Sequence, residues 1–330
     1  MNPLFNVRAH VSRGRCLYWL AVSCLATCMV SAMAVTATTD FSAQLDALWN
    51  FNEPQASEAK FRAEWQRYPA GSREALETTT QIARTQGLRR QFSDADRTLD
   101  GVASKLDGMP ARLRVRYFLE RGRTRNSSGE KTAAVALFRE ALVAADKDAL
   151  PGADYYRVDA LHMLAIAAPA NEQLDWNRKA LAAAEASAYP RAQRWAASLN
   201  HNIGWTYFDQ GDAKTALTYW QKALPLREAA GDVVTIRVAK WTIARGHRAL
   251  GQLDEAETIQ RALVVETEAA SAPDGFVYEE LAEITLAHGE TKAAAEWSRK
   301  AYALLKSDIW LSANEPARLA RLNELAGAAK

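Results

Sequence analysis

The fold is decided between Asn200 and Leu224, where the chain reads NHNIGWTYFDQGDAKTALTYWQKAL. A glycine, Gly211, stands between two runs in which large apolar side chains recur at helical spacing. This pattern predicts two helices joined by a tight turn. The stretch is therefore interpreted as one helical hairpin with its turn at Gly211.

Seven positions in this stretch follow a fixed pattern: a large apolar residue, glycine, tyrosine, a turn glycine, alanine, an aromatic residue and alanine. The residues that meet it, in order, are Ile203, Gly204, Tyr207, Gly211, Ala216, Trp220 and Ala223. The stretch resembles the tetratricopeptide repeat, which has these residue types at these offsets. So many matches within one unit make the resemblance specific.

The same register can be followed along the chain. Its turn positions are Arg90, Gly129, a region at Pro169 and Ala170, Gly211, Gly251 and Gly289. Outside the unit near Pro169, positions seven residues before and five residues after each turn carry only glycine or alanine: Ala83, Gly122, Gly204, Ala244, Ala282, Ala95, Ala134, Ala216, Ala256 and Ala294. The two helices of a hairpin cross at such positions, and a larger side chain would push their axes apart.

This register also divides the chain into segments. Residues 74–307 are predicted to form six tetratricopeptide-like repeats with a period near 40 residues. Residues 41–70 are predicted to form an N-terminal helical hairpin, and residues 314–329 a C-terminal capping helix. No window alternates apolar and polar residues for long enough to predict a sheet. The resemblance implies an all-α fold, a right-handed superhelical solenoid of antiparallel helix hairpins.

The N-terminus has the pattern of an export signal. Three arginines precede an uncharged apolar stretch at residues 16–39, and the tripeptide AMA at residues 32–34 matches an A-x-A cleavage site. We expect residues 1–34 to be a signal peptide of an exported (periplasmic or secreted) protein. Three alternatives stay open: the stretch is long enough for an uncleaved membrane anchor, Cys28 is a candidate lipidation site, and translation from Met33 would give a cytoplasmic protein.

The charge balance argues against two kinds of partner. The 330 residues carry 41 basic and 39 acidic side chains, a formal net charge of +2. Three of the basic residues lie in residues 1–34, so the rest of the chain is nearly neutral. A nearly neutral body gives no electrostatic support for binding nucleic acid or a membrane surface. We expect no nucleic-acid partner, and membrane contact only through an uncleaved N-terminal segment.

The sequence carries no recognisable reaction centre. It lacks the P-loop, dinucleotide-binding and nucleophile-elbow patterns. All three cysteines, Cys16, Cys24 and Cys28, lie in the uncharged N-terminal stretch, and no two histidines are spaced as H-x-x-x-H. The sequence therefore predicts a protein that is not an enzyme and has no metal or other cofactor.

The resemblance implies a binding groove. In tetratricopeptide arrays the first helices of the repeats line a concave surface that binds a peptide or a partner helix. This lining corresponds to positions 13, 10, 6 and 3 residues before each turn, and here it runs from basic through aromatic to acidic. The candidate binding residues are Arg84, Arg123, His201, Trp205, Phe208, Trp241, Arg245, Arg248 and Glu283.

We expect a non-catalytic scaffold that binds a protein or peptide partner in this groove. The middle of the groove combines aromatic and arginine side chains, which carry most of the binding energy at protein interfaces. Two alternatives stay open. One is a structural or assembly subunit of an envelope complex, with the groove filled by its own chain. The other is the sensor module of a signalling system. The sequence does not fix the oligomeric state or the identity of the ligand.

Overall fold

The computed structural model describes residues 41–327, and every regular element in this range is a helix. In chain order the helices are α1 (Phe41–Ala47), α2 (Pro54–Trp65), α3 (Arg73–Leu88), α4 (Phe92–Ala103), α5 (Ala111–Ser127), α6 (Lys131–Ala145), α7 (Ala153–Ala167), α8 (Ala170–Ala186), α9 (Pro190–Gln193), α10 (Trp195–Asp209), α11 (Ala213–Ala230), α12 (Val233–Ala249), α13 (Leu253–Ala269), α14 (Gly275–Ala287), α15 (Thr291–Leu305), α16 (Ile309–Asn314) and α17 (Pro316–Gly327).

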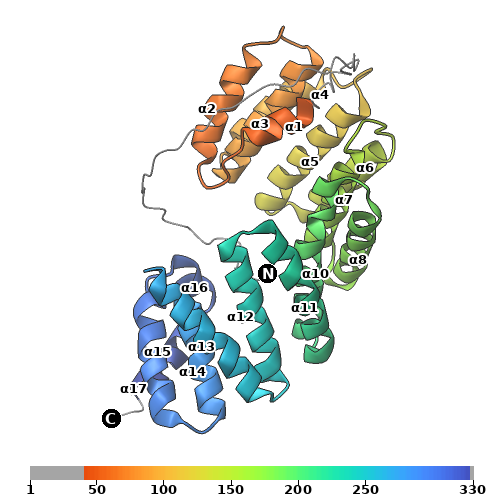
Figure 1. The fold of residues 1–330 in the computed structure, drawn as a ribbon. Coiled ribbons are helices and arrows are strands. Elements are labelled where there is room, and N and C mark those ends of the chain that lie inside the picture. The colour runs from red at the N-terminus through yellow and green to blue at the C-terminus, as the bar shows by residue number, and fades with distance from the viewer. Residues whose placement is uncertain (1–40, 328–330) are drawn as a thin grey trace, which may run out of the picture.

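From α3 to α15 the helices pair as hairpins: α3 with α4, α5 with α6, α7 with α8, α10 with α11, α12 with α13, and α14 with α15. Figure 1 shows the hairpins stacked into a curved array. In this view α6, α8 and α11 lie on the outer side of the curve, and α5, α10 and α12 lie on the inner side. The all-α solenoid of helix hairpins expected from the sequence is confirmed.

The turns inside the hairpins explain the glycines of the register. Gly129, Gly211, Gly251 and Gly289 all have left-handed backbone, with φ between 74° and 95°, a conformation that glycine adopts without steric cost. Arg90 takes the same position in the first hairpin, with φ 61°. Between α7 and α8 the chain turns through two residues of extended backbone, so the third hairpin needs no glycine there.

The hairpins pack closely where a small residue faces a large ring of the other helix. A Cβ atom on Gly204 would lie 2.3 Å from Trp220, and one on Gly122 would lie 2.4 Å from Phe138. Both rings are fully buried, so neither has room to move aside. The alanines at the other crossing positions are buried as well. Small residues in this register are what allow the helices to approach each other.

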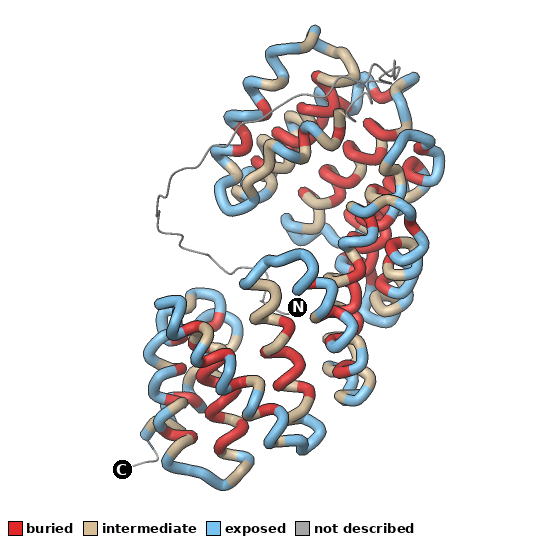
Figure 2. The backbone as a smooth tube through the Cα atoms, viewed as in Figure 1, coloured by how far each residue is buried: buried red, intermediate tan, exposed pale blue. Residues whose placement is uncertain are grey.

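The apolar core runs along the whole array instead of forming one centre. Figure 2 shows buried residues on the sides of the helices that face one another. One apolar cluster joins α5, α6 and α7, and another joins α12, α13, α14 and α15 with α16 and α17. Helix α17 packs against α15 and covers the last hairpin. It begins at Pro316, after the short helix α16, within the segment where the sequence placed one capping helix.

Helices α1 and α2 precede the first hairpin. Helix α2 packs against α3, and α1 also contacts α3. The export signal predicted at residues 1–34 lies outside the described residues. Between residues 41 and 327, no helix combines the length and the apolar character that crossing a membrane requires.

Candidate partner-binding surface

Helix α1 lies against the inner faces of α3 and α5, where the sequence placed the basic end of the groove. Ser42 and Leu45 of α1 are fully buried. Just after α1, Nε1 of Trp49 donates a hydrogen bond to Gln81 of α3 at 3.0 Å. Residues 41–51 therefore fill the inner face of the first hairpins with the protein's own chain.

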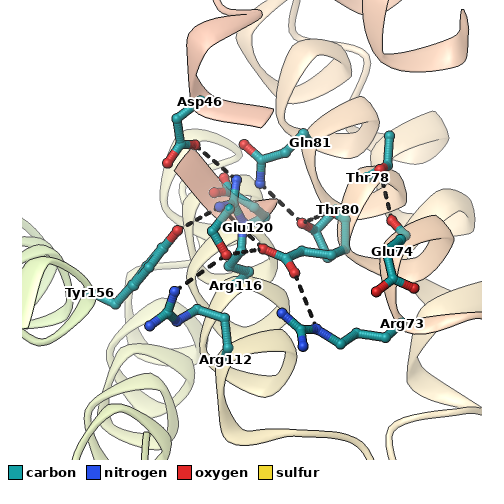
Figure 3. Close-up of polar contacts among 12 residues, drawn as sticks. Asp46, Arg73, Glu74, Thr78, Thr80, Gln81, Arg112, Arg116, Glu120 and Tyr156 are labelled. Carbon is teal, nitrogen blue, oxygen red and sulfur yellow. Dashed lines mark hydrogen bonds and ion pairs between the residues drawn. The ribbon is translucent and has the colours of Figure 1, made fainter. Parts of the chain in front are cut away.

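A buried cluster of charged groups holds α1 in place (Figure 3). Arg116 of α5 is 2% exposed, and it donates to Asp46 of α1 at 3.0 Å and to the Tyr156 hydroxyl of α7 at 2.6 Å. Its Nη1 also lies 3.4 Å from Glu77 of α3, and Ser42 of α1 donates to the same carboxylate. Buried charges need such partners. One guanidinium thus joins four helices.

The two carboxylates of this cluster, Glu77 and Asp46, have pKa values that are shifted in opposite directions. Burial raises the pKa of Glu77 above its ordinary value, although Arg116 opposes the shift. Burial also acts to raise the pKa of Asp46, but the charges of Arg116 and Arg191 outweigh it, so that the pKa is lowered. Arg191 lies 2.5 Å from Asp46. Asp46 is therefore the charged group that anchors α1 between two arginines.

The two basic residues predicted for this end of the groove, Arg84 and Arg123, have partners within the chain. Arg84 of α3 lies 3.5 Å from Glu120 of α5, and its guanidinium lies 5.1 Å from the ring centre of Phe51. Arg123 of α5 lies 2.7 Å from Glu120 and 2.5 Å from Asp159 of α7. These ion pairs link neighbouring first helices, so both arginines help to hold the array together.

The aromatic residues predicted for the middle of the groove do come together. The ring centre of Trp205 in α10 lies 5.6 Å from that of Phe208 and 6.2 Å from that of Trp241 in α12. The guanidinium of Arg245 lies between 5.4 and 5.9 Å from all three ring centres, and 3.5 Å from Glu280 of α14. Trp205, Phe208 and Arg245 are partly exposed. We call these three residues the aromatic–arginine surface.

His201 lies behind this surface and orients it. The side chain is buried, and its Nε2 lies 3.0 Å from Nε1 of Trp205. An indole N–H can only donate, so Nε2 accepts, and the proton of the neutral ring is assigned to Nδ1. Burial lowers the pKa of His201 to about 3. The imidazole is therefore neutral at physiological pH and fixes the Trp205 ring.

The position of Trp241 differs from the expectation of an open groove residue. The side chain is 6% exposed, and its Nε1 donates to the backbone carbonyl of Phe276 at 3.0 Å. Helix α14 packs against α12 and covers the ring. The spacing predicted which face of α12 carries Trp241, but not how closely the next first helix approaches that face. Trp241 is part of the core.

The acidic end of the predicted groove is covered by the C-terminal helix. Glu283 of α14 forms a two-fold hydrogen bond with Arg321 of α17, at 2.7 and 3.0 Å. One turn earlier, Arg248 of α12 bonds both oxygens of Glu280 of α14, at 2.5 and 3.1 Å. The predicted gradient from basic to acidic is thus largely neutralised by ion pairs within the chain.

Sequence reasoning missed the role of α1. The spacing of Leu45 and Trp49 predicted a helix but did not indicate what the helix packs against. The available signal was charge, because Arg112 and Arg116 stand one helical turn apart on a face that also needs acidic partners. Among residues 41–327, no group of three or more His, Cys, Asp or Glu side chains is placed to hold a metal ion.

Comparisons with known proteins agree with this architecture. A family model described as tetratricopeptide repeat matches residues 195–230, which span α10 and α11. The structure of apo RapI superposes with a TM-score of 0.68 at 10% sequence identity, over 87% of this chain and 81% of that chain. Aspartyl phosphate phosphatase F from Bacillus subtilis gives a TM-score of 0.57 at 13% identity, over 89% and 81%.

A third solved structure with this fold is a Rap protein complexed with competence and sporulation factor. It superposes with a TM-score of 0.53 at 14% identity, over 88% of this chain and 87% of that chain. No curated protein matches the chain as a relative. The described residues form a solenoid of helix hairpins like those of tetratricopeptide repeats, and the repeat model itself matches the fourth hairpin. At these identities the solved structures show the fold alone.

Proposed function

We propose that the protein is a non-catalytic scaffold that binds a protein or peptide partner on its aromatic–arginine surface. The observation that carries this proposal is the contrast between two halves of the inner face. The first half is formed by the first helices α3, α5 and α7, and the second half by α10, α12 and α14. Residues 41–51 fill the first half and leave its charged groups paired. Trp205, Phe208 and Arg245 lie on the second half and keep part of their surface exposed to solvent.

The chemistry of this surface suits a ligand with an apolar side chain next to an acidic one. Trp205 and Phe208 offer ring surface for burial, and an arginine beside them can pair with a carboxylate or stack on a ring. Arg245 has spare capacity for a carboxylate, because Glu280 bonds more closely to Arg248 than to it. Burial lowers the pKa of Arg245, and Glu280 only partly offsets this effect.

The structural neighbours support binding as a use of this fold. One of them was solved as a complex with competence and sporulation factor. Its overall path resembles that of this chain, so a curved array of this kind can carry a ligand. The proposal for this protein still depends on its own residues, because a fold alone does not define a ligand.

A matched set of variants tests the proposal. Purified wild-type chain is immobilised, exposed to an extract of the source organism, and the retained partner is then titrated against each variant. Phe208→Ala and Arg245→Gln should each weaken that partner by about tenfold or more, since truncating an interface anchor costs about 2 kcal/mol. Val265→Ala, at a 68% exposed position on α13, is the control. A partner that binds all variants equally would overturn the proposal.

A second candidate function is that of an assembly subunit. Two observations favour it: α1 fills part of the groove, and α16 presents Ile309 and Trp310 at 86% and 37% exposure. Exposed apolar side chains that lie together mark candidate contacts with other proteins. Size-exclusion chromatography with light scattering tests this idea. A stable oligomer that Ile309→Ser dissociates would favour it, and a monomer at all concentrations would contradict self-assembly.

We also propose that the protein is exported, on the evidence of the N-terminal sequence pattern. Cleavage after the AMA tripeptide would give a mature protein that begins near Val35. N-terminal sequencing of the protein from fractionated cells measures this directly. A cytoplasmic product that still contains Arg8 would contradict export.

A further inference from the structure

A cleft of about 800 Å³ lies between the fourth and fifth hairpins. The backbones of α10 and α12 lie farther apart than those of α3 and α5, and the two helices meet through the side chains of Trp205, Trp241 and Arg245. The C-terminal end of α11 lies between them, so the cleft is lined by the N-terminal parts of α10 and α12 and by this end of α11. The volume is in the range of binding sites for small ligands.

Arg227, at the end of α11, lines this cleft as a buried cation. The residue is 8% exposed, and its Nη1 donates to the backbone carbonyl of Thr235 at 2.8 Å. No carboxylate of the described residues forms an ion pair with it. Asp232 also lines the cleft, but its Oδ1 accepts the backbone N–H groups of Val234 and Thr235 at 2.9 and 3.3 Å. Burial accordingly lowers the pKa of Arg227, and Asp232 only partly opposes this.

Other deeply buried arginines of the chain, in contrast to Arg227, form ion pairs with carboxylates. Arg112 and Arg116 are 0% and 2% exposed, and each forms an ion pair with a carboxylate. A buried charge without such a partner is costly. The cleft holds a second arginine, the exposed Arg194, which also has no ion pair within residues 41–327. Two arginines that form no ion pair among the described residues therefore line the same cleft, which suits a negatively charged ligand.

The rest of the lining limits what kind of anion would fit. Leu226, Val234 and Val238 give the cleft a largely apolar wall. His201 lies at the side next to the aromatic–arginine surface, and its buried Nδ1 has no acceptor among the described residues. The cleft thus combines cationic and N–H donors with aliphatic surface. A multiply charged anion such as a phosphate would leave the apolar wall unused.

We propose that this cleft binds an aliphatic carboxylate, a chemical group shared by the C-terminal end of a peptide and by a free aliphatic acid. The carboxylate pairs with Arg227 and Arg194, and the aliphatic chain lies against Leu226, Val234 and Val238. The proposal goes beyond partner binding on the aromatic–arginine surface, because none of the residues that it uses belongs to that surface.

Isothermal titration with matched probes tests the chemistry and separates the two sources. The free acids are octanoate and acetyl-Ala-Ala-Leu, and the controls are their uncharged amides. We expect saturable binding near one ligand per chain for at least one acid, and none for either amide. The acid that binds more tightly identifies the source. Failure of both acids to bind, or equal binding of an acid and its amide, overturns the proposal.

Variants then locate the binding site. Arg227→Gln should weaken the acid that binds by about tenfold or more, and Arg194→Gln by a smaller factor, because Arg194 is exposed and its charge is screened. Arg261→Gln is the control, since Arg261 lies on α13 and pairs with Glu257 of its own helix. It should bind like the wild type. An equal loss in the Arg261 variant would reveal non-specific charge attraction and overturn the proposal.

A second variant keeps the test decisive if Arg227→Gln reduces folding. Val238→Glu places a negative charge in the apolar wall and should abolish acid binding while the circular-dichroism helix signal is preserved. Unchanged binding in both Val238→Glu and Arg194→Gln overturns the proposal. Such a result would leave the proposed function untouched, because partner retention is measured separately with the Phe208 and Arg245 variants.

Discussion

The two halves of the array share one repeat register, yet their inner faces differ. In the first half, the positions thirteen residues before the turns are Glu77 and Arg116, which bind α1. In the second half, the same positions are Ser198 and Val238, which line the cleft between α10 and α12. The repeat pattern therefore determines where the inner face lies. The residues at one position of each repeat influence whether the chain covers that face.

The charges of the two halves also serve different purposes. Arg116 is bonded to a carboxylate, a tyrosine and a second carboxylate on three other helices. Among the described residues, Arg227 has a hydrogen bond to a backbone carbonyl and no ion pair, and Arg245 has one shared carboxylate at 3.5 Å. Burial lowers the pKa of both of these arginines. A buried charge with full pairing holds helices together, whereas an under-paired charge is available to a ligand.

The largest expected effect separates these two kinds of arginine. Arg116→Ala should cost about 3–5 kcal/mol, because it removes from the interior the guanidinium that Asp46, Glu77 and the Tyr156 hydroxyl share. Arg245→Ala should cost about 1 kcal/mol or less, since Glu280 keeps its bonds to Arg248. Thermal and urea unfolding followed by circular dichroism measure both. Equal losses would remove the proposed distinction between the halves.

The next effect should be the same in both halves. Gly204→Leu and Gly122→Leu should each destabilise by roughly 1–3 kcal/mol or more, because a side chain at either position overlaps a fully buried ring. Gly101→Ala, where an added Cβ meets nothing within 4 Å, is the control and should not destabilise. If only one of the two leucine variants has a lower melting temperature than the wild type, the two crossings are not equivalent.

Each half also holds one buried histidine whose pKa is lowered by burial, to about 4 for His162 and about 3 for His201, from 6.5. Below pH 6.5 the unfolded chain binds a proton at each site and the folded chain does not. The stability from each neutral ring is therefore complete above pH 6.5 and is lost as the pH falls. The free energy of unfolding should therefore fall by about 2 kcal/mol for each histidine when the pH is lowered from 7 to 5.

The measurement is the difference between unfolding free energies at pH 7 and pH 5. His201→Gln and His162→Gln should each reduce this difference by about 2 kcal/mol, since the replaced side chain does not titrate. Other titrating groups contribute equally to wild type and variant and cancel in the comparison. A difference that is identical in all three proteins would mean that neither ring is buried as neutral imidazole.

The fold could be predicted because its determinants are local in sequence. Gly211 and Gly204 act through backbone φ and through a crossing with Trp220 in the next helix. What could not be predicted depends on residues far apart in the chain. Asp46 and Arg116 are 70 residues apart, and no repeat pattern relates a helix that precedes the repeats to the face that it covers.

The candidate site was predicted only in part for the same reason. The register correctly brought Trp205, Phe208 and Arg245 together, since these positions lie on adjacent first helices. Whether each residue is exposed depends on how tightly the next hairpin packs. Trp241 is buried because α14 packs against α12. Arg227 was missed because it lies at the end of a second helix, outside the positions from which the groove was built. That it forms no ion pair with any described residue becomes evident only in three dimensions.

The smallest expected effect concerns the turns, where the first hairpin has Arg90 and the fourth has Gly211. Both residues are left-handed, with φ 61° and 85°. Left-handed backbone costs an ordinary L-residue about 1–2 kcal/mol, and an added Cβ on Gly211 meets nothing within 4 Å. Gly211→Ala should therefore destabilise by about 1 kcal/mol through backbone strain alone, as measured by a small fall in melting temperature.

The reverse change should not give the reverse effect. Arg90→Gly removes the strain, but glycine gains about 0.5–1 kcal/mol of freedom in the unfolded chain, and the guanidinium contact with the Phe92 ring at 5.6 Å is lost. The two terms nearly cancel, so the melting temperature should rise slightly or stay unchanged. Arg90→Asn, which tolerates this backbone, is the matched control. A loss above about 1 kcal/mol in Arg90→Gly would mean that the side chain, and not the backbone, holds the first turn.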